Sequence, residues 1–383
     1  MPAWEITFDP RLDLGDHELL RLLVQVEAHR QITNKIPLPP PVAARLNRLN
    51  LIRQIKGTTG IEGNTLTEDE ISTLLDVAPD TDAQVVVAPT NRADLERTEV
   101  RNAARVASYI RQIARPGSDP IRVTEELIRE LHRITTEGCY YENNVPGQYR
   151  QHRVHAGDYL PPDHADVPRL MHAFVEFINS REALAYGTAI RAIVAHFYLI
   201  SIHPFGDGNG RTSRALEALL LYQGGYNVRG FYSPANFFYR RREEYIAALQ
   251  AARFQHRGRL QEFVRFALRG FVEEIDRVQS EILAFVRVVM FQDYVTDLYR
   301  QDAINHRCYT FLTLLLESGS ALNISVPEYR DRSHPLVDHL YKGIKSKRTV
   351  LRDLAVMKDL ELISVTPDNR IRANVDVMNR FTE

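Results

Sequence analysis

The sequence contains few cysteines and no long uninterrupted hydrophobic stretch. Only two of its 383 residues are cysteine, Cys139 and Cys308. A disulfide framework is therefore excluded, and a reducing compartment, the cytoplasm, is expected. Two cysteines are also too few for a cysteine-based zinc site. No segment approaches the ~18 consecutive apolar residues of a membrane span. The N-terminus lacks a basic start followed by an apolar run, so we expect neither a signal peptide nor a membrane partner.

Charge of one sign is not in excess either. The chain has 48 Lys and Arg residues against 49 Asp and Glu, for a formal net charge of -1. This balance argues against a protein whose whole surface coats nucleic acid or an acidic membrane, but it is compatible with a local basic patch. Hydrophobic residues at 44% and charged residues at 25% are typical of a globular protein. The length suggests two or three domains.

The hydrophobic spacing is mostly helical. Apolar residues recur at intervals of three and four through most of the chain. The sequence from Thr67 to Glu70 has the form of a capping box, which starts a helix reaching about Val77, and a loop is expected over 79–89. The segment 145–162 departs from this pattern, because prolines and glycines with short alternating stretches predict a hairpin or flap.

The last quarter of the chain differs from the rest. Helices are followed there by two short alternating stretches around a turn at 367–369, an order that describes a winged helix. We therefore predict a mainly α fold, with a helical core that carries a β-hairpin flap and a C-terminal winged helix-turn-helix. The predicted division is an N-terminal helical region at 1–115, a catalytic core at 116–300 and a winged-helix domain at 301–383.

The most informative stretch runs from His203 to Arg214, with the sequence HPFGDGNGRTSR. One helix is expected to end at its start, and another to begin at about Asn209 after a glycine-rich loop. Glycines let the backbone approach a ligand closely, and the N–H groups at a helix N-terminus bind anions. Arg211 and Arg214 lie on one face of the first helical turn, where guanidinium groups hold phosphate oxygens. Asp207 suits Mg²⁺ bound together with phosphates, and His203 suits a general base acting on a hydroxyl.

A helix–loop–helix turn with surface charges is the simpler interpretation of the glycines or of His203 alone. The whole stretch, however, resembles the signature of the Fic/Doc family, H-x-F-x-[DE]-G-N-G-R-x-x-R, at every fixed position. The resemblance extends over about residues 40–290. It implies a Fic-type helical core.

The resemblance also implies a reaction, the transfer of AMP from ATP to a Ser, Thr or Tyr hydroxyl of a protein with release of pyrophosphate. His203 would deprotonate the target hydroxyl, Phe205 would pack inside, and Asp207 would bind Mg²⁺. In the related Doc kinases a Lys stands in place of Gly210 and the second arginine is missing, so Gly210 and Arg214 favour transfer of AMP over transfer of phosphate. The residues assigned to ATP binding in this stretch are Gly208, Asn209, Gly210, Arg211, Thr212, Ser213 and Arg214.

Two flanking segments are also similar to the family. The segment 145–162 resembles the flap that pairs with a target segment through main-chain hydrogen bonds, and an ordinary proline-containing loop is the alternative. The stretch 241–250, RREEYIAALQ, resembles a helix that often shows Tyr-Tyr near the adenine. Here Ile246 follows Tyr245, so Tyr245 is a candidate for ATP binding and a packing tyrosine is the alternative. The flap residues assigned to target binding are Val154, His155, Ala156 and Gly157.

Upstream, the stretch 58–64, TTGIEGN, resembles the inhibitory motif of the family, [ST]-x-x-x-E-[GN]. It assigns an inhibitory role to Thr58, Glu62 and Gly63. In that pattern the glutamate occupies the γ-phosphate position, so ATP binds in a non-productive pose. A carboxylate paired with Arg214 would remove a cation that the γ-phosphate needs. The placement ahead of the core matches class II Fic proteins, and an exposed glutamate in a turn is the alternative.

The stretch 341–352, YKGIKSKRTVLR, is basic and contains no acidic residue. A basic recognition helix in a winged helix contacts DNA phosphates and a groove. Winged-helix tails of this kind occur on some Fic proteins, where protein contacts or a homodimer are the alternatives to DNA. A solvated basic face is the simplest interpretation.

The leading hypothesis is an auto-inhibited protein adenylyltransferase that uses ATP and Mg²⁺ and modifies a protein target, the chain itself included. Two alternatives stay open: a de-AMPylase, which removes AMP from a modified target, and a DNA-binding regulator with a nucleotide-sensing Fic core. A sensor would not need His203, yet His203 and every other fixed position of the motif are present. The sequence does not identify the target, because a flap that binds through its backbone encodes little side-chain specificity.

Overall fold

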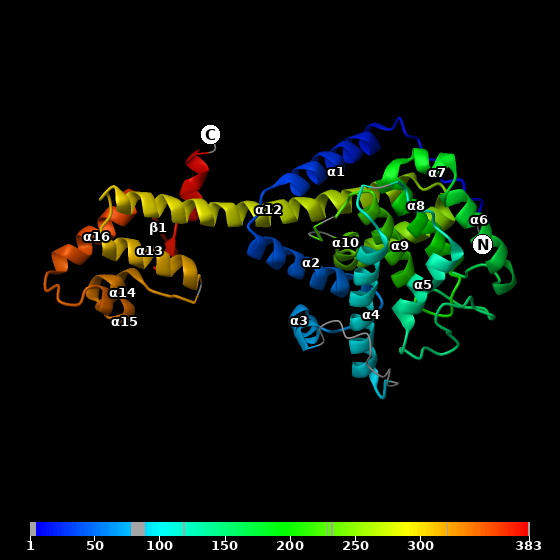
Figure 1. Ribbon diagram of the computed structural model, residues 1–383, viewed down its shortest axis with the longest axis horizontal. Coiled ribbons are helices and arrows are strands. Elements are labelled where there is room, and N and C mark those ends of the chain that lie inside the picture. The colour runs from blue at the N-terminus through cyan, green and yellow to red at the C-terminus, as the bar shows by residue number, and fades with distance from the viewer. Residues whose placement is uncertain are drawn as a thin grey trace. The chain divides into compact units, whose positions relative to one another are not determined.

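The structure is a computed structural model that describes residues 5–77, 89–117, 119–227, 229–230, 233–319 and 321–381. Within these residues the fold is mainly α-helical, as predicted, and the strands form one two-stranded sheet (Figure 1). None of the described helices is long and apolar enough to span a membrane. The loop predicted over 79–89 lies outside the described residues, apart from Pro89.

The chain divides into two compact units, residues 1–278 and 279–383. The division falls within α12 (Gln261–Arg300). The organisation into three parts that we predict from the sequence stays a prediction.

The first unit contains the helices that precede this division. They are α1 (His17–Lys35), α2 (Pro40–Gly60), α3 (Glu68–Val77), α4 (Arg92–Ile113), α5 (Glu125–Thr136), η1 (His164–Asp166), α6 (Val167–Ile178), α7 (Arg181–Ala185), α8 (Gly187–Ile202), α9 (Asn209–Gln223), α10 (Pro234–Arg240), α11 (Arg242–Gln250) and the π-helical turn η2 (Ala251–Gln255). The capping box predicted at the start of α3 is confirmed. The Glu70 N–H donates to Thr67 Oγ1 at 3.3 Å, and the Thr67 N–H donates to the Glu70 carboxylate at 2.8 Å.

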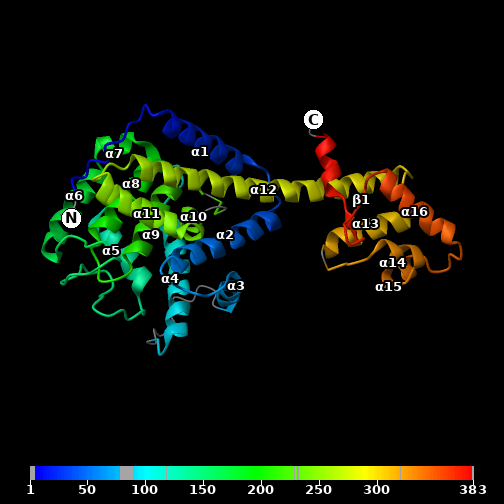
Figure 2. The same ribbon diagram turned by 180° about the vertical axis from the view of Figure 1, so that it is seen from behind.

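The centre of the first unit is the helix pair α8 and α9. All of α8 from Ala189 to its end is buried, which follows from an almost uniformly apolar sequence. Helix α9 packs against α8 and also contacts α2, α4 and α5. Figure 2 shows the same arrangement from behind. The loop 203–208 that joins α8 to α9 is therefore held at both ends by buried helices.

Helix α2 lies very close to α10. A Cβ atom placed on Gly57 would come within 2.7 Å of the Ala235 carbonyl, so only glycine permits this approach. On its other side α2 shares a small apolar cluster with α3 and α4, formed by Ile52, Ile55, Ile71 and Val100. These contacts fix the C-terminal end of α2 and the turn that follows it.

The segment expected to form the hairpin flap contains less regular structure than predicted. It has an isolated antiparallel bridge, in which Ala156 and Tyr159 exchange backbone hydrogen bonds of 3.0 and 3.1 Å, in place of two strands. The physical reason lies in the buried side chain of Arg150. It donates to the carbonyls of His152 and Pro162 at 2.9 and 2.5 Å, so these carbonyls bind a guanidinium rather than a partner strand.

After the end of α12, the described residues of the second unit form short helices, a small sheet and a terminal 3-10 helix. They are α13 (His306–Ser318), α14 (Val326–Asp331), α15 (Pro335–Leu340), α16 (Lys347–Asp359), β1 (Ile363–Val365), β2 (Ile371–Ala373) and η3 (Val375–Phe381). Strands β1 and β2 are antiparallel, with Ser364 opposite Arg372, and Ser325 forms a bridge to Arg370. Helices α13 and α16 and the two strands agree with the order expected from the sequence, whereas α14 and α15 were not predicted. The winged-helix assignment stays a prediction.

Candidate active site

A cavity of about 490 Å³ lies over the loop between α8 and α9, within the size range of small-molecule sites. Its walls come from this loop, the start of α9, the turn after α2, the bridged segment 155–159 and α11. The cavity brings together most of the residues that the sequence singles out: Glu62, His155, Ala156, Gly157, His203, Asp207, Gly208, Asn209, Gly210, Arg214 and Tyr245.

His203 ends α8 and lies at the edge of this cavity. Its backbone is in the left-handed region, with φ 54°, and its N–H still bonds to the Leu199 carbonyl at 3.0 Å. The ring Nδ1 lies 3.2 Å from the Ile200 carbonyl. Because a carbonyl only accepts, Nδ1 must carry the ring proton, and Nε2 then has the lone pair. Burial lowers the pKa of His203 to about 4, so the ring is neutral at neutral pH and able to accept a proton.

The loop that follows is shaped by two internal contacts. Phe205 is fully buried, as predicted, and stacks on His132 with ring centroids 3.7 Å apart. The Asn209 side chain bonds to both the N–H and the carbonyl of Phe205, at 2.9 and 3.0 Å. The first helical hydrogen bond of α9 runs from the Thr212 N–H to the Gly208 carbonyl. The preceding N–H groups therefore lie at a helix N-terminus, which favours anions.

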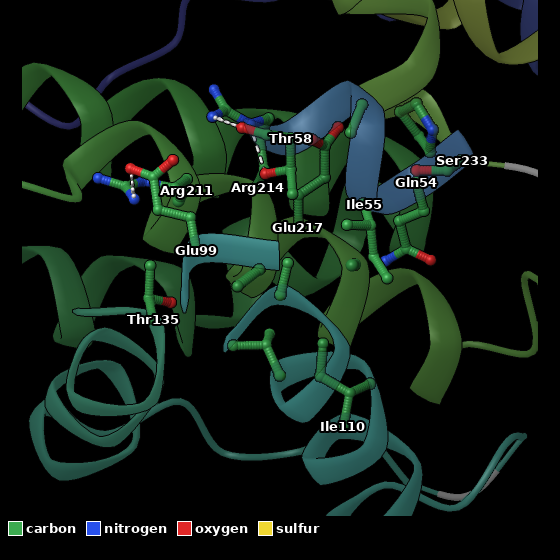
Figure 3. Close-up of a pocket in the computed structure, with 16 residues that line it drawn as sticks. Gln54, Ile55, Thr58, Glu99, Ile110, Thr135, Arg211, Arg214, Glu217 and Ser233 are labelled. Carbon is green, nitrogen blue, oxygen red and sulfur yellow. Dashed lines mark hydrogen bonds and ion pairs between the residues drawn. The ribbon is translucent and has the colours of Figure 1, made fainter. Parts of the chain in front are cut away.

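Arg211 is buried and held by three groups. Its guanidinium pairs with Glu99 at 2.9 Å and with Asp207 at 3.0 Å. The Tyr141 hydroxyl also contacts it, and its charge lies 4.9 Å from the centre of the Tyr141 ring. Figure 3 shows Arg211 and Glu99 facing one another. This cation is therefore fixed in place before any ligand binds.

Arg214 is also buried, and the turn after α2 occupies its guanidinium. It donates to the Thr58 carbonyl at 2.9 Å, to Thr58 Oγ1 at 3.1 Å and to Glu62 Oε1 at 2.6 Å (Figure 3 shows the Thr58 contact). Partial desolvation raises the pKa of Glu62, but the charges of Arg214 and Arg211 outweigh this and lower it below its usual value. A Cβ atom at Gly210 would collide with the Glu62 carboxylate, so glycine at this position makes room for the pair.

Asp207 is the residue that could hold a divalent cation. Its side chain is about half exposed, and the contacts made to it by the described residues, from Arg211 and the Gly208 N–H, both use Oδ1. Among the described residues no group of three or more acidic, His or Cys side chains could hold a metal ion. A single carboxylate fits Mg²⁺, which is commonly bound by one or two carboxylates together with substrate phosphates.

Tyr245 is buried beside the cavity and makes internal contacts. Its hydroxyl lies 2.9 Å from His196 Nε2, and His196 Nδ1 lies 2.9 Å from Glu217. Its ring stacks against Phe238. Burial raises the pKa of Tyr245 to about 12. The packing interpretation therefore describes much of its environment, although the residue also lines the cavity.

Some residues chosen from the sequence lie elsewhere. The Thr212 and Ser213 side chains are fully buried, and their hydroxyls donate to the carbonyls four residues earlier, at 2.9 and 2.8 Å. Val154, Thr58, Gly63 and Arg211 are likewise not among the residues that line the 490 Å³ cavity. Each of the last three is next to a residue that lines it, because Thr58 bonds to Arg214, Gly63 follows Glu62 in the chain and Arg211 pairs with Asp207.

A second, much smaller cavity lies behind the two arginines, between α2, α4 and α9 (Figure 3). Its volume is about 40 Å³, which is enough for a few water molecules but not for a nucleotide. Of these two cavities, only the larger one is a candidate for nucleotide binding.

Three residues that hold the site together, Asn64, Glu99 and Arg150, were given no role on the basis of the sequence. Arg150 donates to the His203 carbonyl at 2.8 Å as well as to the two carbonyls of the flap. Glu99 pairs with Arg211, and Asn64 bonds to Glu99 at 2.8 Å. One signal could have found Glu99, because Glu96, Glu99 and Asn102 recur every three residues on the buried face of α4.

Residues 122–221 match the family model described as Fic/DOC family. "Protein adenylyltransferase Fic" of Aedes aegypti is 30% identical over 215 residues, which cover 56% of this chain and 39% of that protein. The protein of the same name in Drosophila ananassae is 28% identical over 246 residues, covering 64% of this chain and 45% of that protein. The chain spans less than half the length of these two relatives.

Two solved structures share the fold. A Fic family protein from Desulfovibrio desulfuricans G20 has a TM-score of 0.54 at 20% identity, covering 97% of this chain and 98% of that one. Fic-1 from C. elegans has a TM-score of 0.53 at 23% identity, covering 70% and 73%. The motif from His203 to Arg214, the cavity above it and these matches agree. Residues 122–221 of this chain therefore form a region that matches the Fic/DOC family.

Proposed function

We propose that the chain is a protein adenylyltransferase, which transfers AMP from ATP to a Ser, Thr or Tyr hydroxyl of a protein, its own chain included, and releases pyrophosphate. The observation that carries this proposal is the placement of His203. Its neutral ring lines the same cavity as the N-terminus of α9 and Arg214. The names of the two curated relatives support the reaction type.

In the proposed step the target hydroxyl oxygen bonds to the α-phosphorus. The bond from this phosphorus to the oxygen that bridges the α- and β-phosphates breaks, and its electron pair leaves with pyrophosphate. The hydroxyl proton passes to His203 Nε2. The N–H groups at the start of α9, together with Arg211 and Arg214, hold the phosphate oxygens. Asp207 would hold Mg²⁺, which neutralises phosphate charge when bound.

We propose further that Glu62 keeps the enzyme inhibited, in the manner of class II Fic proteins. The 2.6 Å contact between Glu62 and Arg214 supports this, because a carboxylate lies where the arginine would otherwise receive the γ-phosphate. The Thr58 hydroxyl and carbonyl bind the same guanidinium. While these contacts persist, ATP binds without the cation that aligns its terminal phosphate.

The test is incubation with Mg²⁺ and ATP labelled at the α-phosphate, followed by intact mass measurement for an added AMP. Glu62→Gly should label the protein or its target more strongly than the natural chain, and Glu62→Gln separates the effect of charge from that of bulk. His203→Ala, added to Glu62→Gly, should abolish labelling while ATP binding persists. Equal labelling by the natural chain and Glu62→Gly refutes inhibition, and retained labelling after His203→Ala refutes the role of the base.

Removal of AMP from a modified target is the second candidate activity. It is favoured by one observation, that Glu62 and His203 line the same cavity, where a carboxylate could orient water toward the phosphorus. An AMP-modified protein incubated with the natural chain should then release AMP, and Glu62→Gly should lose this release. Faster labelling by Glu62→Gly with no release by the natural chain decides for the forward reaction.

For the second unit, we propose duplex DNA as the partner of the stretch 341–352. Its five basic side chains are exposed, three of them on α16, whereas Val350, Leu354 and Met357 on the other face of α16 are buried in the core. That is the arrangement of a recognition helix. Anisotropy with a random duplex should show affinity that falls steeply with salt. If no salt-sensitive binding is seen, DNA is ruled out as the partner, and protein contacts or a homodimer remain. Sedimentation would detect a homodimer. The basic residues of the stretch are Lys342, Lys345, Lys347, Arg348 and Arg352.

A further inference from the structure

The geometry points to Asn64, Glu96 and Glu99 as positioning residues that hold Glu62 against Arg214. We define the two glutamates, together with Arg92, as the α4 clasp, since all three lie on α4 and bind the turn 62–65. The inference rests on the proposed auto-inhibition. The inference adds a structural cause of the auto-inhibition, namely that a separate helix fixes the inhibitory turn.

Asn64 is the centre of the contact. It is buried, and its Nδ2 donates to the Glu96 carbonyl at 3.0 Å and to Glu99 Oε2 at 2.8 Å. Its Oδ1 accepts from the Leu66 N–H at 3.2 Å. Both donor hydrogens and the acceptor of this amide are therefore used, and any movement of the turn would leave polar groups unsatisfied in the interior.

The rest of the clasp binds the residues on either side of Asn64. The Glu96 carboxylate accepts from Thr65 Oγ1 at 3.0 Å and from Arg92 Nε at 3.1 Å. Arg92 Nη2 in turn donates to the Gly63 carbonyl at 3.1 Å. The backbone directly after Glu62 is thus fixed at three consecutive residues.

Glu99 connects the turn to the anion site. One of its oxygens accepts from Asn64 and the other pairs with Arg211 at 2.9 Å. A buried carboxylate needs its donors, because removing one partner leaves its charge uncompensated. Displacement of the turn therefore disturbs the same carboxylate that orients Arg211.

The clasp is needed because the pair between Glu62 and Arg214 is not sealed from solvent. The Glu62 side chain is 36% exposed, against 2% for Arg214, and a partly exposed ion pair contributes little by itself. Gly63, with φ 96°, gives the turn a flexible residue next to Glu62. The clasp restricts that flexibility, so the position of the turn decides how long Glu62 occupies Arg214.

The decisive experiment compares Asn64→Ala with Asn102→Ala. Both remove a buried amide that donates to more than one acceptor, but Asn102 binds the carbonyls of Thr135 and Glu137 and the sulfur of Cys139, away from the turn. Loss of buried hydrogen bonds at Asn64 should raise AMP transfer by about fivefold or more, and Asn102→Ala should not raise it. A thermal melt shows whether Asn64→Ala folds. If it folds poorly, the milder variant Thr65→Val replaces it in the test, and it should give a smaller rise in AMP transfer.

Two further measurements separate this inference from the proposed function. In the Glu62→Gly background Asn64→Ala should add nothing, because no carboxylate remains to be positioned, and a further rise there would overturn the clasp. ATP affinity, measured by calorimetry, should increase in both Glu62→Gly and Asn64→Ala. If both bind ATP more tightly but neither transfers AMP, the proposed activity fails and the clasp stands. If Asn64→Ala changes neither ATP affinity nor transfer, the clasp is refuted.

Discussion

Positive charge is concentrated in two regions of the chain, and the two regions differ in whether the charged side chains are buried or exposed. In the first unit Arg211 and Arg214 are 6% and 4% exposed, and each is bound to a carboxylate. In the second unit the basic side chains of 341–352 are exposed. Buried cations require partners that fix their geometry, whereas exposed cations keep their hydration and act over longer distances.

This difference in burial predicts how each region responds to amino-acid substitution. The buried arginines should be sensitive to small changes in shape, even when charge is kept, because their partners are fixed. The exposed stretch should be sensitive only to the amount of charge. The experiments below test this comparison.

The largest effect is expected for Arg211→Lys, measured in the Glu62→Gly background so that inhibition does not mask it. An ammonium group cannot reproduce the fork that reaches both Glu99 and Asp207. Initial rates of AMP transfer should fall by about 10²–10³, the usual cost of removing one donor to a developing charge. Arg348→Lys, on the exposed stretch, is the matched control and should leave the rate unchanged. Equal rates for both variants would contradict the comparison.

A smaller effect, of opposite sign, is expected for Gly57→Ala. The new methyl group would meet the Ala235 backbone, which cannot move aside as a side chain can. Overpacking of this kind costs about 1–3 kcal/mol, and α2 should shift away from α10 and carry Thr58 and Glu62 with it. AMP transfer should rise by about 5–150-fold, the range that corresponds to such an energy. At Gly60 the nearest atoms to the added one belong to the Tyr239 side chain, which can move aside more easily than backbone, so Gly60→Ala should activate less. A larger rise there would contradict this view of α2.

The parts of the site that could be predicted from the sequence are local ones. The glycine-rich loop and the start of α9 at Asn209 follow from twelve adjacent residues, and the structure has them where expected. The contact of Glu62 with Arg214 was expected only through the family resemblance, because 152 residues separate the pair. Nothing local in the sequence pairs Glu99 with Arg211, 112 residues later. Such contacts depend on how α4 and α9 pack, which hydrophobic spacing does not specify.

The segment 145–162 shows the reverse case, in which the sequence predicts a regular structure that does not form. Its alternating residues and glycines predicted a hairpin, but the Arg150 side chain binds the carbonyls that a second strand would need. A side-chain contact within the segment therefore overrides the pattern of alternating residues. In the second unit α13, α16 and the two strands could be predicted, since each of them is defined by its own short periodicity, whereas α14 and α15, of six residues each, could not.

The dependence of AMP transfer on pH should be slight. Burial lowers the pKa of His203 to about 4 from a usual value near 6.5. The base is therefore neutral down to about pH 4, and it becomes protonated only as the pH falls through that value. Initial rates of Glu62→Gly between pH 5.5 and 8, at fixed ionic strength, should change by less than about twofold from this group. A clear loss of rate as the pH falls through about 6.5 would show that the ring is more solvated than its burial implies.

The same lowered pKa has a consequence for stability, with a definite sign. The unfolded chain accepts a proton on this histidine near pH 6.5, before the folded chain does. The contribution of His203 to stability is therefore complete above pH 6.5 and is lost as the pH falls toward 4. A urea midpoint that decreases over this range in the natural chain, and decreases less in His203→Ala, would agree with the assignment.

The smallest effects are expected on the exposed stretch. Replacing Lys345, Lys347 and Arg348 together by Ala should change the free energy of unfolding by no more than about 0.5 kcal/mol per site, and AMP transfer not at all. If duplex DNA is the partner, the same variant should bind it more weakly, with the slope of log affinity against log salt reduced by about 0.9 for each phosphate that the variant no longer neutralises. Lys358→Ala, near the other end of α16, is the control for removing a cation from the same helix. A loss of AMP transfer in the triple variant would break the comparison, because exposed cations of the second unit would then act on the arginines buried in the first.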